Sequence, residues 1–454
     1  MADCIAIAPE LPFRAQVTEL ATHLSRCMPT SGDAAASKEF VAGYEAQLGE
    51  EGEEVEESKR KEVIRGIATK VGEVGGALEG QKESDVESSH LLLQYVLSTT
   101  FSGEEYEQVI RTVLEGLKKG VEVHGQSGRI TRLEVAARIL NNTYNSLPPS
   151  SALRAPTLLT LLTALSKFTD LSALPLTPSQ LSAATDEWSL SASEKSAFLV
   201  SAADIYRSTS NYSTAYDILL LALRYESKGE VADKAAVVAV LDEKRFNVDG
   251  LSASSGLSGE AKELVGLLGE EDAVKAVKKG EEWVGQQSAW IQARGVPQFT
   301  PEIILRKLRL LSLAHICSTA PTRSLSYTDI SSALSIPSSD VEAWVFDAIR
   351  TGLISARISQ PAQTVRIISV SSAADRAFGK SQWELLEKRL GEWKVAVSGA
   401  REAVREAEEI ARRGPETQRR YMPDERRGGR QEGQQGQGQG QQQQQGRDRE
   451  EVAA

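Results

Sequence analysis

The sequence predicts a mostly α-helical protein, in which a helical-repeat solenoid is followed by a winged-helix subdomain and a long C-terminal helix. Three observations lead to this fold class. Apolar residues recur with helical spacing from about residue 129 to residue 227, and strand signals there are nearly absent. The spacing changes to alternation after Gly352. A sustained heptad pattern then begins at Trp383.

Composition limits the classes of protein that fit. The chain has 454 residues, 41% apolar and 25% charged, as expected for a globular protein or an extended array. Its net charge of −11 disfavours non-specific binding to nucleic acid. Three cysteines and four histidines have no ligand-like spacing, which indicates a reducing compartment. Because we find neither a secretory signal nor an apolar run of roughly 18 residues, we expect a cytosolic or nuclear protein.

Shifts in composition divide the chain into five parts. We predict an N-terminal helical region with an acidic insert (1–125), a helical-repeat array (126–298), a winged-helix part (299–372), a C-terminal heptad helix (373–413) and a disordered tail rich in Gln, Gly and Arg (414–454). The insert, "GEEGEEVEE" at residues 49–57, has six glutamates in nine positions. The tail lacks the apolar residues that would offset the entropy cost of ordering.

Within the array, helices follow one another with short links. "TRLEVAARILNNTYNSL" ends at the breaker "PPS", and "SASEKSAFLVSAADIYRS" begins with Ser191 or Ser193 as a cap. No clean fixed-period repeat is found, so the stacking is degenerate. Residues 245–280 are rich in Gly and Ser, and they predict a loop that leads to one short helix around Glu263–Val277.

A stronger helix signal returns at "TPEIILRKLRLLSLAHICS". Thr300 is placed to cap this helix, and Pro301 occupies its first position. One face is shared by Ile304, Leu308, Leu311 and His315, and three basic residues are predicted to lie off it: Arg306, Lys307 and Arg309.

Residues 327–354 have the outline of a helix-turn-helix. Ser339 and Glu342 fit a capping box at the start of the second helix, and Gly352 suits its left-handed end. Beyond it, "LISARIS" and "TVRIISV" alternate as two strands joined by "QPAQ", which makes the unit a winged helix. The predicted winged-helix core consists of seven apolar residues: Ile330, Leu334, Val341, Trp344, Val345, Ala348 and Ile349.

The polar face of the second helix bears on DNA recognition. Its exposed positions carry three acids and one base: Asp340, Glu342, Asp347 and Arg350. A groove-reading helix needs groups that bond base edges and do not repel phosphate. The wing adds only Arg357 and Arg366, too few for the phosphate contacts that drive affinity. A packed module with a solvated polar face is therefore favoured over DNA recognition.

The last helix carries a heptad seam. Its positions are spaced three and four residues apart: Trp383, Leu386, Leu390, Trp393, Val397, Ala400, Val404, Ala407 and Ala411. A helix over residues 382–413 would be about 48 Å long, longer than a winged helix can cover. We expect it to dock into a helical bundle formed with other chains. The alternatives are a helix folded back on its own solenoid and a frayed helix in solvent.

No motif predicts an enzyme, a metal or a cofactor. The histidines are isolated, whereas a metalloprotease zinc site would need a His-x-His pair. "GGALEGQK" at residues 75–82 only approaches a phosphate-binding loop, because Gln81 stands where lysine should follow glycine. His315 and Cys317 are two positions apart, so a helix does not bring them onto one face.

These motifs together resemble the PCI-domain family, the scaffold module shared by the proteasome lid, the COP9 signalosome and translation initiation factor 3. The residues that carry the resemblance are "LRKLRLLSLAHIC" and "YTDISSAL…DVEAWVFDAIRTGLISARISQ". "RAFGKSQWELLEKRLGEWKVAV", together with "RLEVAARILNNTYNSLP" and "AYDILLLALRY", is similar to the subunit M family of eukaryotic translation initiation factor 3. Residues 245–280 and the Gln-rich tail depart from that pattern.

The resemblance implies a cytoplasmic, non-catalytic scaffold subunit that supports 43S pre-initiation complex assembly and mRNA recruitment to the small ribosomal subunit. It implies association with other subunits through the wing and the last helix, indirect contact with the ribosome, and neither membrane nor sequence-specific DNA binding. The expected partner-binding residues are Arg357, Val365 and Ile367 in the wing and Trp383, Leu386, Leu390, Trp393, Val397, Ala400 and Val404 in the seam. A COP9 signalosome or proteasome lid subunit, or a winged-helix regulator that binds nucleic acid, are the alternatives.

Overall fold

The fold comes from a computed structural model, which describes residues 11–28, 32–49, 55–80, 82–168, 171, 176–226, 229–252, 256–270, 273–320, 322–371 and 380–412. The chain forms two compact units, residues 1–378 and residues 379–454. The described part is mainly helical, as predicted. Most of the acidic insert and the whole Gln-rich tail lie outside the described residues.

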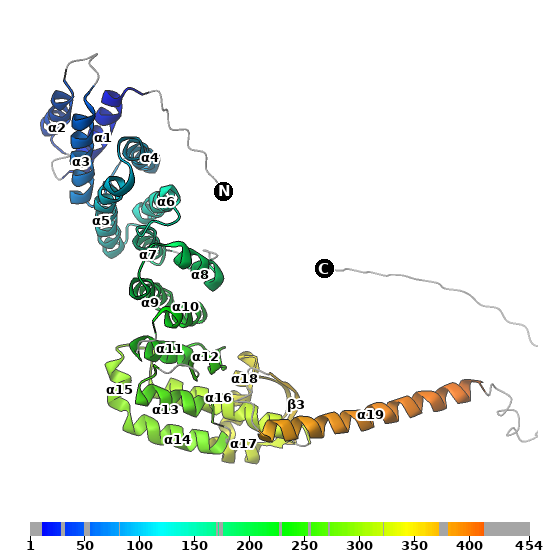
Figure 1. The fold of residues 1–454 in the computed structure, drawn as a ribbon. Helices are drawn as coiled ribbons and strands as arrows, with labels where there is room; N and C mark the ends of the chain where they lie inside the picture. Colours follow the sequence, from blue (N-terminus) through cyan, green and yellow to red (C-terminus); the bar gives the residue numbers. More distant parts are fainter. Residues whose placement is uncertain are drawn as a thin grey trace, which may run out of the picture. The chain divides into compact units, whose positions relative to one another are not determined.

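The first unit begins with a run of helices (Figure 1). Their bounds are α1 Phe13–Cys27, α2 Ala34–Gln47, α3 Glu57–Glu73, α4 Glu83–Thr100, α5 Gly103–Ser127, α6 Ile130–Ser146, α7 Arg154–Leu165, α8 Pro178–Glu187, α9 Ala192–Ser208, α10 Tyr212–Tyr225 and α11 Gly229–Leu241. Helices close in sequence contact one another: α6 with α7, α9 with α10, and α10 with α11. This contact pattern is that of the predicted solenoid.

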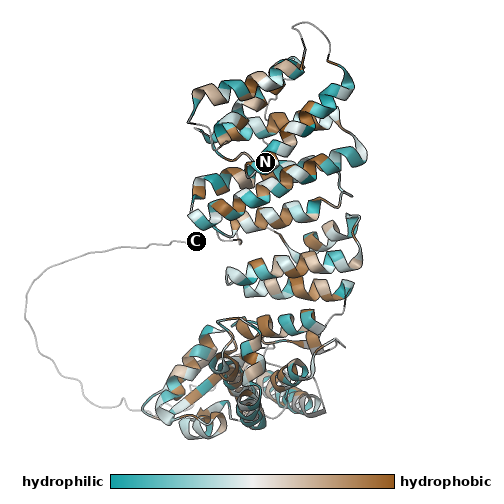
Figure 2. Cartoon of the chain, turned by 90° about the vertical axis from the view of Figure 1, so that its left-hand side faces the viewer, coloured by the Kyte–Doolittle hydropathy of each residue, from teal (hydrophilic) through white to brown (hydrophobic). Residues whose placement is uncertain are grey.

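Local sequence signals set where these helices begin and end. Ser191 caps α9 in a capping box with Glu194, as one of the two predicted caps. Thr177 and Gln180 form a second capping box at α8. Along the array, the helices carry both apolar and polar residues (Figure 2), and α5, for example, buries Val109, Ile110 and Val113 on one side. Their apolar sides join in one continuous buried core.

Glycines allow α3 and α5 to pack backbone against backbone. A Cβ on Gly116 would lie 2.7 Å from the Cα of Gly72. One on Gly120 would overlap the carbonyl oxygen of Gly75. The turn after α3 also needs glycine at Gly76, where φ is 77° and a Cβ would lie 2.8 Å from the Cα of Leu117. The segment that approaches a phosphate-binding loop in sequence is therefore a packing turn.

Two buried histidines form hydrogen bonds with the backbone of this turn. His23 of α1 and His90 of α4 place their Nε2 atoms 2.9 Å from the carbonyl oxygen of Ala77 and 2.8 Å from that of Gly76. The two rings meet edge to face, with centroids 6.4 Å apart. Burial lowers the pKa of His90 to about 4 and also lowers the pKa of His23. Both rings are therefore neutral at pH 7, and each Nε2–H donates to a carbonyl oxygen.

Acid is expected to loosen this N-terminal region. The pKa of His90 falls from 6.5 to about 4 on folding, so between these values the unfolded state binds more protons. Stability therefore falls as the pH drops through this window, by about 2 kcal/mol at pH 5. Amide hydrogen exchange in α4, corrected for the intrinsic pH effect, should show lower protection at pH 5 than at pH 7. His90→Gln should remove most of that difference, and equal wild-type protection at both pH values would contradict the expectation.

The segment after α11 is more ordered than the sequence predicts. The sequence predicts a loop and one short helix around Glu263–Val277 within residues 245–280, but three helices begin there: α12 Asp249–Ser252, α13 Gly259–Leu268 and α14 Ala273–Gln286. Helix α15 Ser288–Ala293 follows. Gly269 ends α13 inside the range predicted as one helix. Edge-to-face contacts of Trp290 with Trp283 and Phe299 then hold this segment together.

The winged helix follows α16 Pro301–Thr319. It consists of β1 Ser324–Ser326, α17 Tyr327–Leu334, the 3₁₀ turn η2 Ser338–Asp340, α18 Val341–Arg350, β2 Ile354–Ser359 and β3 Thr364–Val370. The predicted hairpin of β2 and β3 is present, and β1 adds a third strand in the antiparallel order β1-β3-β2. Three residues give no periodic signal, which is why the sequence did not predict β1.

The second unit contains α19 Lys380–Arg412, a single helix of 33 residues. Such a helix is about 50 Å long. Its position agrees with the predicted heptad helix. No helix in the described part of the chain combines the length and apolar character needed to cross a membrane.

Candidate functional site: the winged helix, its joint with the array, and helix α19

The core of the winged helix is built from the residues that helical spacing singled out. Five of the seven are fully buried: Ile330, Leu334, Val341, Val345 and Ala348. Trp344 and Ile349 are half-buried and pack against the same core. The guanidinium of Arg309 lies 5.8 Å from the centroid of the Trp344 ring and covers it. The apolar face of α18 therefore holds α17 and the sheet together.

The start of α18 differs from the predicted capping box. Asp340 is the N-cap residue and makes no side-chain cap, because the turn Ser338–Asp340 precedes the helix. The Glu342 carboxylate is engaged elsewhere. It accepts hydrogen bonds from the Tyr327 hydroxyl at 3.0 Å and from Gln360 Nε2 at 2.8 Å. Glu342 thus ties α18 to α17 and to the tip of the wing.

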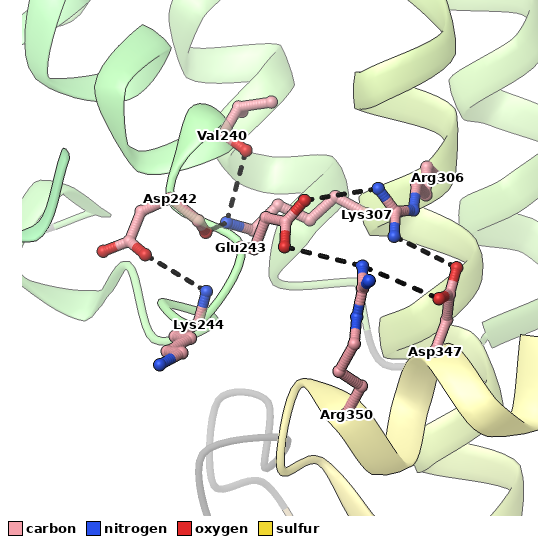
Figure 3. A network of polar contacts seen from close by, with 8 residues as sticks. All are labelled: Val240, Asp242, Glu243, Lys244, Arg306, Lys307, Asp347 and Arg350. Atoms are coloured by element: carbon pink, nitrogen blue, oxygen red, sulfur yellow. Dashed lines mark hydrogen bonds and ion pairs between the residues drawn. The ribbon is translucent and has the colours of Figure 1, made fainter. Parts of the chain in front are cut away.

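The remaining charges of α18, Asp347 and Arg350, pair with residues of the helical array while Arg350 stays largely exposed (Figure 3). Asp347 lies 3.0 Å from Arg306 of α16 and 3.7 Å from Arg350. Glu243, in the turn after α11, lies 3.3 Å from Arg306 and 3.8 Å from Arg350. The four side chains form a closed ring of alternating charge. The predicted solvated face of α18 is therefore corrected in part, because Asp347 and Arg350 link the winged helix to the array.

Lys307 lies behind this ring and is 4% exposed. Its Nζ donates to the backbone oxygens of Ala239, of Val240 at 3.5 Å and of Asp242 at 2.7 Å. These carbonyls belong to the last turn of α11 and the residue after it. Carbonyls at the end of a helix have no N–H partner within the helix, and Lys307 supplies one. The expectation that Lys307 lies off the buried face of α16 is wrong. Its long side chain reaches acceptors that the sequence does not place nearby.

Two opposing effects act on the Lys307 amine. Burial lowers its pKa to about 7, and this desolvation outweighs the attraction of Asp242. The three carbonyl oxygens and the negative end of α11 favour the ammonium, which has three N–H groups to donate. We call this set of residues (Lys307, Arg306, Glu243, Asp347 and Arg350) the array–wing joint. It fixes the winged helix on the end of the array.

A small cavity adjoins the joint. It has a volume of about 70 Å³ and is lined by Val240, Leu241, Phe246, Ile303, Lys307 and Leu310, among others. Sites for cofactors and drug-sized ligands are larger, about 300–1,000 Å³. The cavity can hold a few water molecules.

The three wing residues expected to bind a partner differ in their exposure to solvent. Arg357 is exposed on β2, whereas Val365 is fully buried and Ile367 is 6% exposed on β3. Because β3 is the central strand, its backbone groups are also paired on both sides. The prediction that Val365 and Ile367 contact a partner is therefore wrong. Both side chains belong to the core of the winged helix itself.

The seam residues of α19 are exposed. They are Trp383, Leu386, Leu390, Trp393, Val397, Ala400 and Val404. Two further large apolar residues of α19, Val395 and Ile410, are exposed off the seam. Alternating spacings of three and four residues place the seam side chains on one stripe of the helix. A stripe with two tryptophans is the kind of surface that another helix covers.

Side chains that could hold a metal ion do not cluster in the described part of the chain. Among those residues no group of three or more His, Cys, Asp or Glu side chains is placed to hold a metal ion. Burial raises the pKa of the Cys317 thiol to about 12, which keeps it protonated.

Duplex DNA is expected to bind the full chain weakly, with a Kd no tighter than about 10 μM at 150 mM salt. The reason is that the polar side of α18 is occupied by contacts with the array and the wing, and that its acids would repel phosphate. A gel-shift titration at 50 and 200 mM salt checks this expectation. Tight binding that weakens steeply with salt would contradict it.

Two protein families match the region just described. The family described as PCI domain matches residues 289–368, a range that includes α16, α17 and α18. The chain contains a PCI domain. The family described as eIF3 subunit M, C-terminal helix matches residues 376–404, which cover most of α19. The resemblance to PCI proteins, and to subunit M among them, is confirmed.

Proteins named eukaryotic translation initiation factor 3 subunit M are similar to this chain, two of them over most of its length. The protein of Aspergillus clavatus is 27% identical over 343 residues, which span 72% of this chain and 70% of that protein. That of Pyricularia oryzae is 23% identical over 351 residues, or 72% and 76% of the two chains. That of Schizosaccharomyces pombe is 36% identical over 111 residues, which span 24% of this chain and only 26% of its own.

Sequence reasoning missed the array–wing joint. Its acceptors and its lysine are 65 to 68 residues apart in the chain. One signal was available, because Lys307 stands three residues after Ile304 and four before Leu311 and so falls on their face. Lysine is rarely buried without a partner, and the sequence does not show that α11 supplies one.

Proposed function

We propose that the chain is a non-catalytic scaffold subunit of translation initiation factor 3. In this role it supports 43S pre-initiation complex assembly and mRNA recruitment to the small ribosomal subunit. The observation that carries the proposal is α19, whose apolar seam is exposed and whose sequence matches the C-terminal helix of eIF3 subunit M. The chain acts in the cytoplasm, and it contacts the ribosome indirectly, through other subunits.

Two surfaces would hold the chain in the complex. The seam of α19 packs into a bundle with helices of other subunits, where its tryptophans are removed from water. The outer edge of β2 in the wing associates with a strand of a neighbouring subunit. The array–wing joint supports this role, because it holds the wing at a fixed angle to the array and so presents the edge in one orientation.

The five-part division of the chain is part of the same proposal. The N-terminal region and the array act as a spacer, the winged helix and α19 provide the contacts, and the Gln-rich tail has no assigned role. Nucleic-acid recognition is disfavoured by the charge and the contacts of α18.

Affinity purification of the tagged full chain, followed by mass spectrometry, tests the function. We expect subunits of translation initiation factor 3 and proteins of the small ribosomal subunit. Recovery of proteasome lid or COP9 signalosome subunits in their place would contradict the proposal. So would recovery of the chain alone.

A further inference from the structure

The outer face of the wing sheet has an unusual composition. Side chains that alternate with the buried ones point away from the core: Ser324, Ser355, Arg357, Ser359, Thr364, Arg366 and Ser369. Two arginines are thus surrounded by hydroxyl groups, and the set contains no acidic side chain. The nearby Ile368, at a bulge in β3, is 51% exposed.

Arg357 and Arg366 occupy directly opposite positions on β2 and β3. Both are exposed, and among the described residues neither guanidinium has an ion-pair or hydrogen-bond partner. Like charges in directly opposite positions destabilise a pair of strands. The fold therefore bears a repulsion that no acid of the described chain relieves. A carboxylate from outside would relieve it.

The two arginines belong to a row that runs straight across the sheet. Ser324 of β1 faces Arg366 of β3, and Arg366 faces Arg357 of β2. Because the strand order is β1-β3-β2, the row ends at Arg357 on an edge strand. No further strand of the described chain pairs with β2. A strand added there would extend the row by one residue, directly opposite Arg357.

From this geometry we infer that the wing selects an added strand that carries Asp or Glu opposite Arg357. The acid neutralises the arginine pair, and it fixes the register, since a shift of one residue would turn that side chain to the other face. Ser355 and Ser359, two positions to either side, fit small or polar neighbours on the incoming strand. The inference rests on the proposed function, to which it adds the chemistry of the partner strand.

A nucleic-acid backbone is the competing occupant of a surface with arginines and hydroxyls. Three observations favour the protein strand. Only two unpaired arginines stand on the face, no aromatic side chain is available to stack on a base, and the row ends at an open strand edge. Exposed Ile368 adds an apolar contact, which suits a protein partner.

Zero-length cross-linking tests the inference in the full chain purified with its complex. Arg357→Lys places an amine in the row, and a carbodiimide couples that amine to a carboxyl group in direct contact with it, with loss of the activating group as a urea. The matched control is Ala362→Lys, which places an amine on the exposed tip of the wing, off the sheet face. We expect Arg357→Lys alone to couple to an Asp or Glu in an extended segment of another subunit.

A charge swap then tests whether the contact selects the partner. Arg357→Glu should weaken binding of the full chain to the coupled subunit by at least tenfold. Exchange of the partner's acid for arginine should restore the affinity to within about threefold, which a merely structural defect would not allow.

Three outcomes would overturn the inference. One is that the Arg357→Lys amine couples only to carboxyl groups of this chain, or that Ala362→Lys couples to another subunit equally well. A second is that nuclease treatment releases the chain from the complex, which would assign the face to nucleic acid. The third is no coupling while initiation factor 3 subunits still co-purify, which would leave the proposed function intact and reject the register pairing alone. Failure to co-purify with those subunits at all would reject the proposed function first.

Discussion

Replacing Trp393 with glutamate is expected to release the chain from its complex. Trp393 is 61% exposed at the middle of the α19 seam. A buried tryptophan side chain covers about 150–250 Å² of surface, and residues of this type dominate helix-bundle interfaces. We expect a loss of at least about 2 kcal/mol, or roughly thirtyfold in Kd, because the carboxylate would also have to be desolvated. Co-purification from cells, and titration against the isolated partner subunits, measure the change.

The matched control is Val395→Glu. Val395 is 73% exposed on the same helix, but it lies off the seam, so the same new charge should leave the affinity within about twofold. Equal losses from both variants would mean that the stripe has no special role. Circular dichroism of each variant checks that α19 remains helical.

Lys307→Met is expected to detach the winged helix from the array without unfolding either part. Methionine replaces the apolar stem of lysine but lacks the terminal amine, so the carbonyls of Ala239 and Asp242 lose their partner inside the protein. Breaking a buried charged contact of this kind costs about 3 kcal/mol. Hydrogen exchange at the end of α11 should therefore accelerate roughly a hundredfold.

Lys244→Met is the control for that experiment, because Lys244 is exposed in the same turn. It should leave exchange in α11 unchanged. If Lys307→Met also left exchange there unchanged, the array–wing joint would not hold the two parts together. A decrease in protection throughout α1 to α10 would instead indicate global unfolding.

Local patterns were sufficient to predict the winged helix and α19. The core positions from Val341 to Ile349 follow from helical spacing, and the strands follow from the change of period after Gly352. The seam needed only its heptad spacing. Helical spacing, strand alternation and heptad spacing each lie within a single helix or strand. Predicting them therefore requires no knowledge of contacts between distant parts of the chain.

The parts that escaped prediction depend on residues far apart in the chain. Lys307 is buried because α11 offers it carbonyls from a segment 65 to 68 residues earlier. β1 is too short to show the two-residue alternation of a strand. Its three residues form a strand only because they pair with β3. Alternation along β3 could have shown that Val365 and Ile367 point inward and Arg366 outward, since apolar residues line the core face.

Deleting residues 380–454 separates assembly from folding. The truncated chain lacks α19 and the residues beyond it but keeps the compact unit of residues 1–378. We expect its hydrogen exchange to match that of the full chain over α1 to α18, and we expect it to elute alone when the full chain elutes with initiation factor 3 subunits. Unchanged co-elution of the truncated chain would contradict the assignment of α19 as the main attachment to the complex.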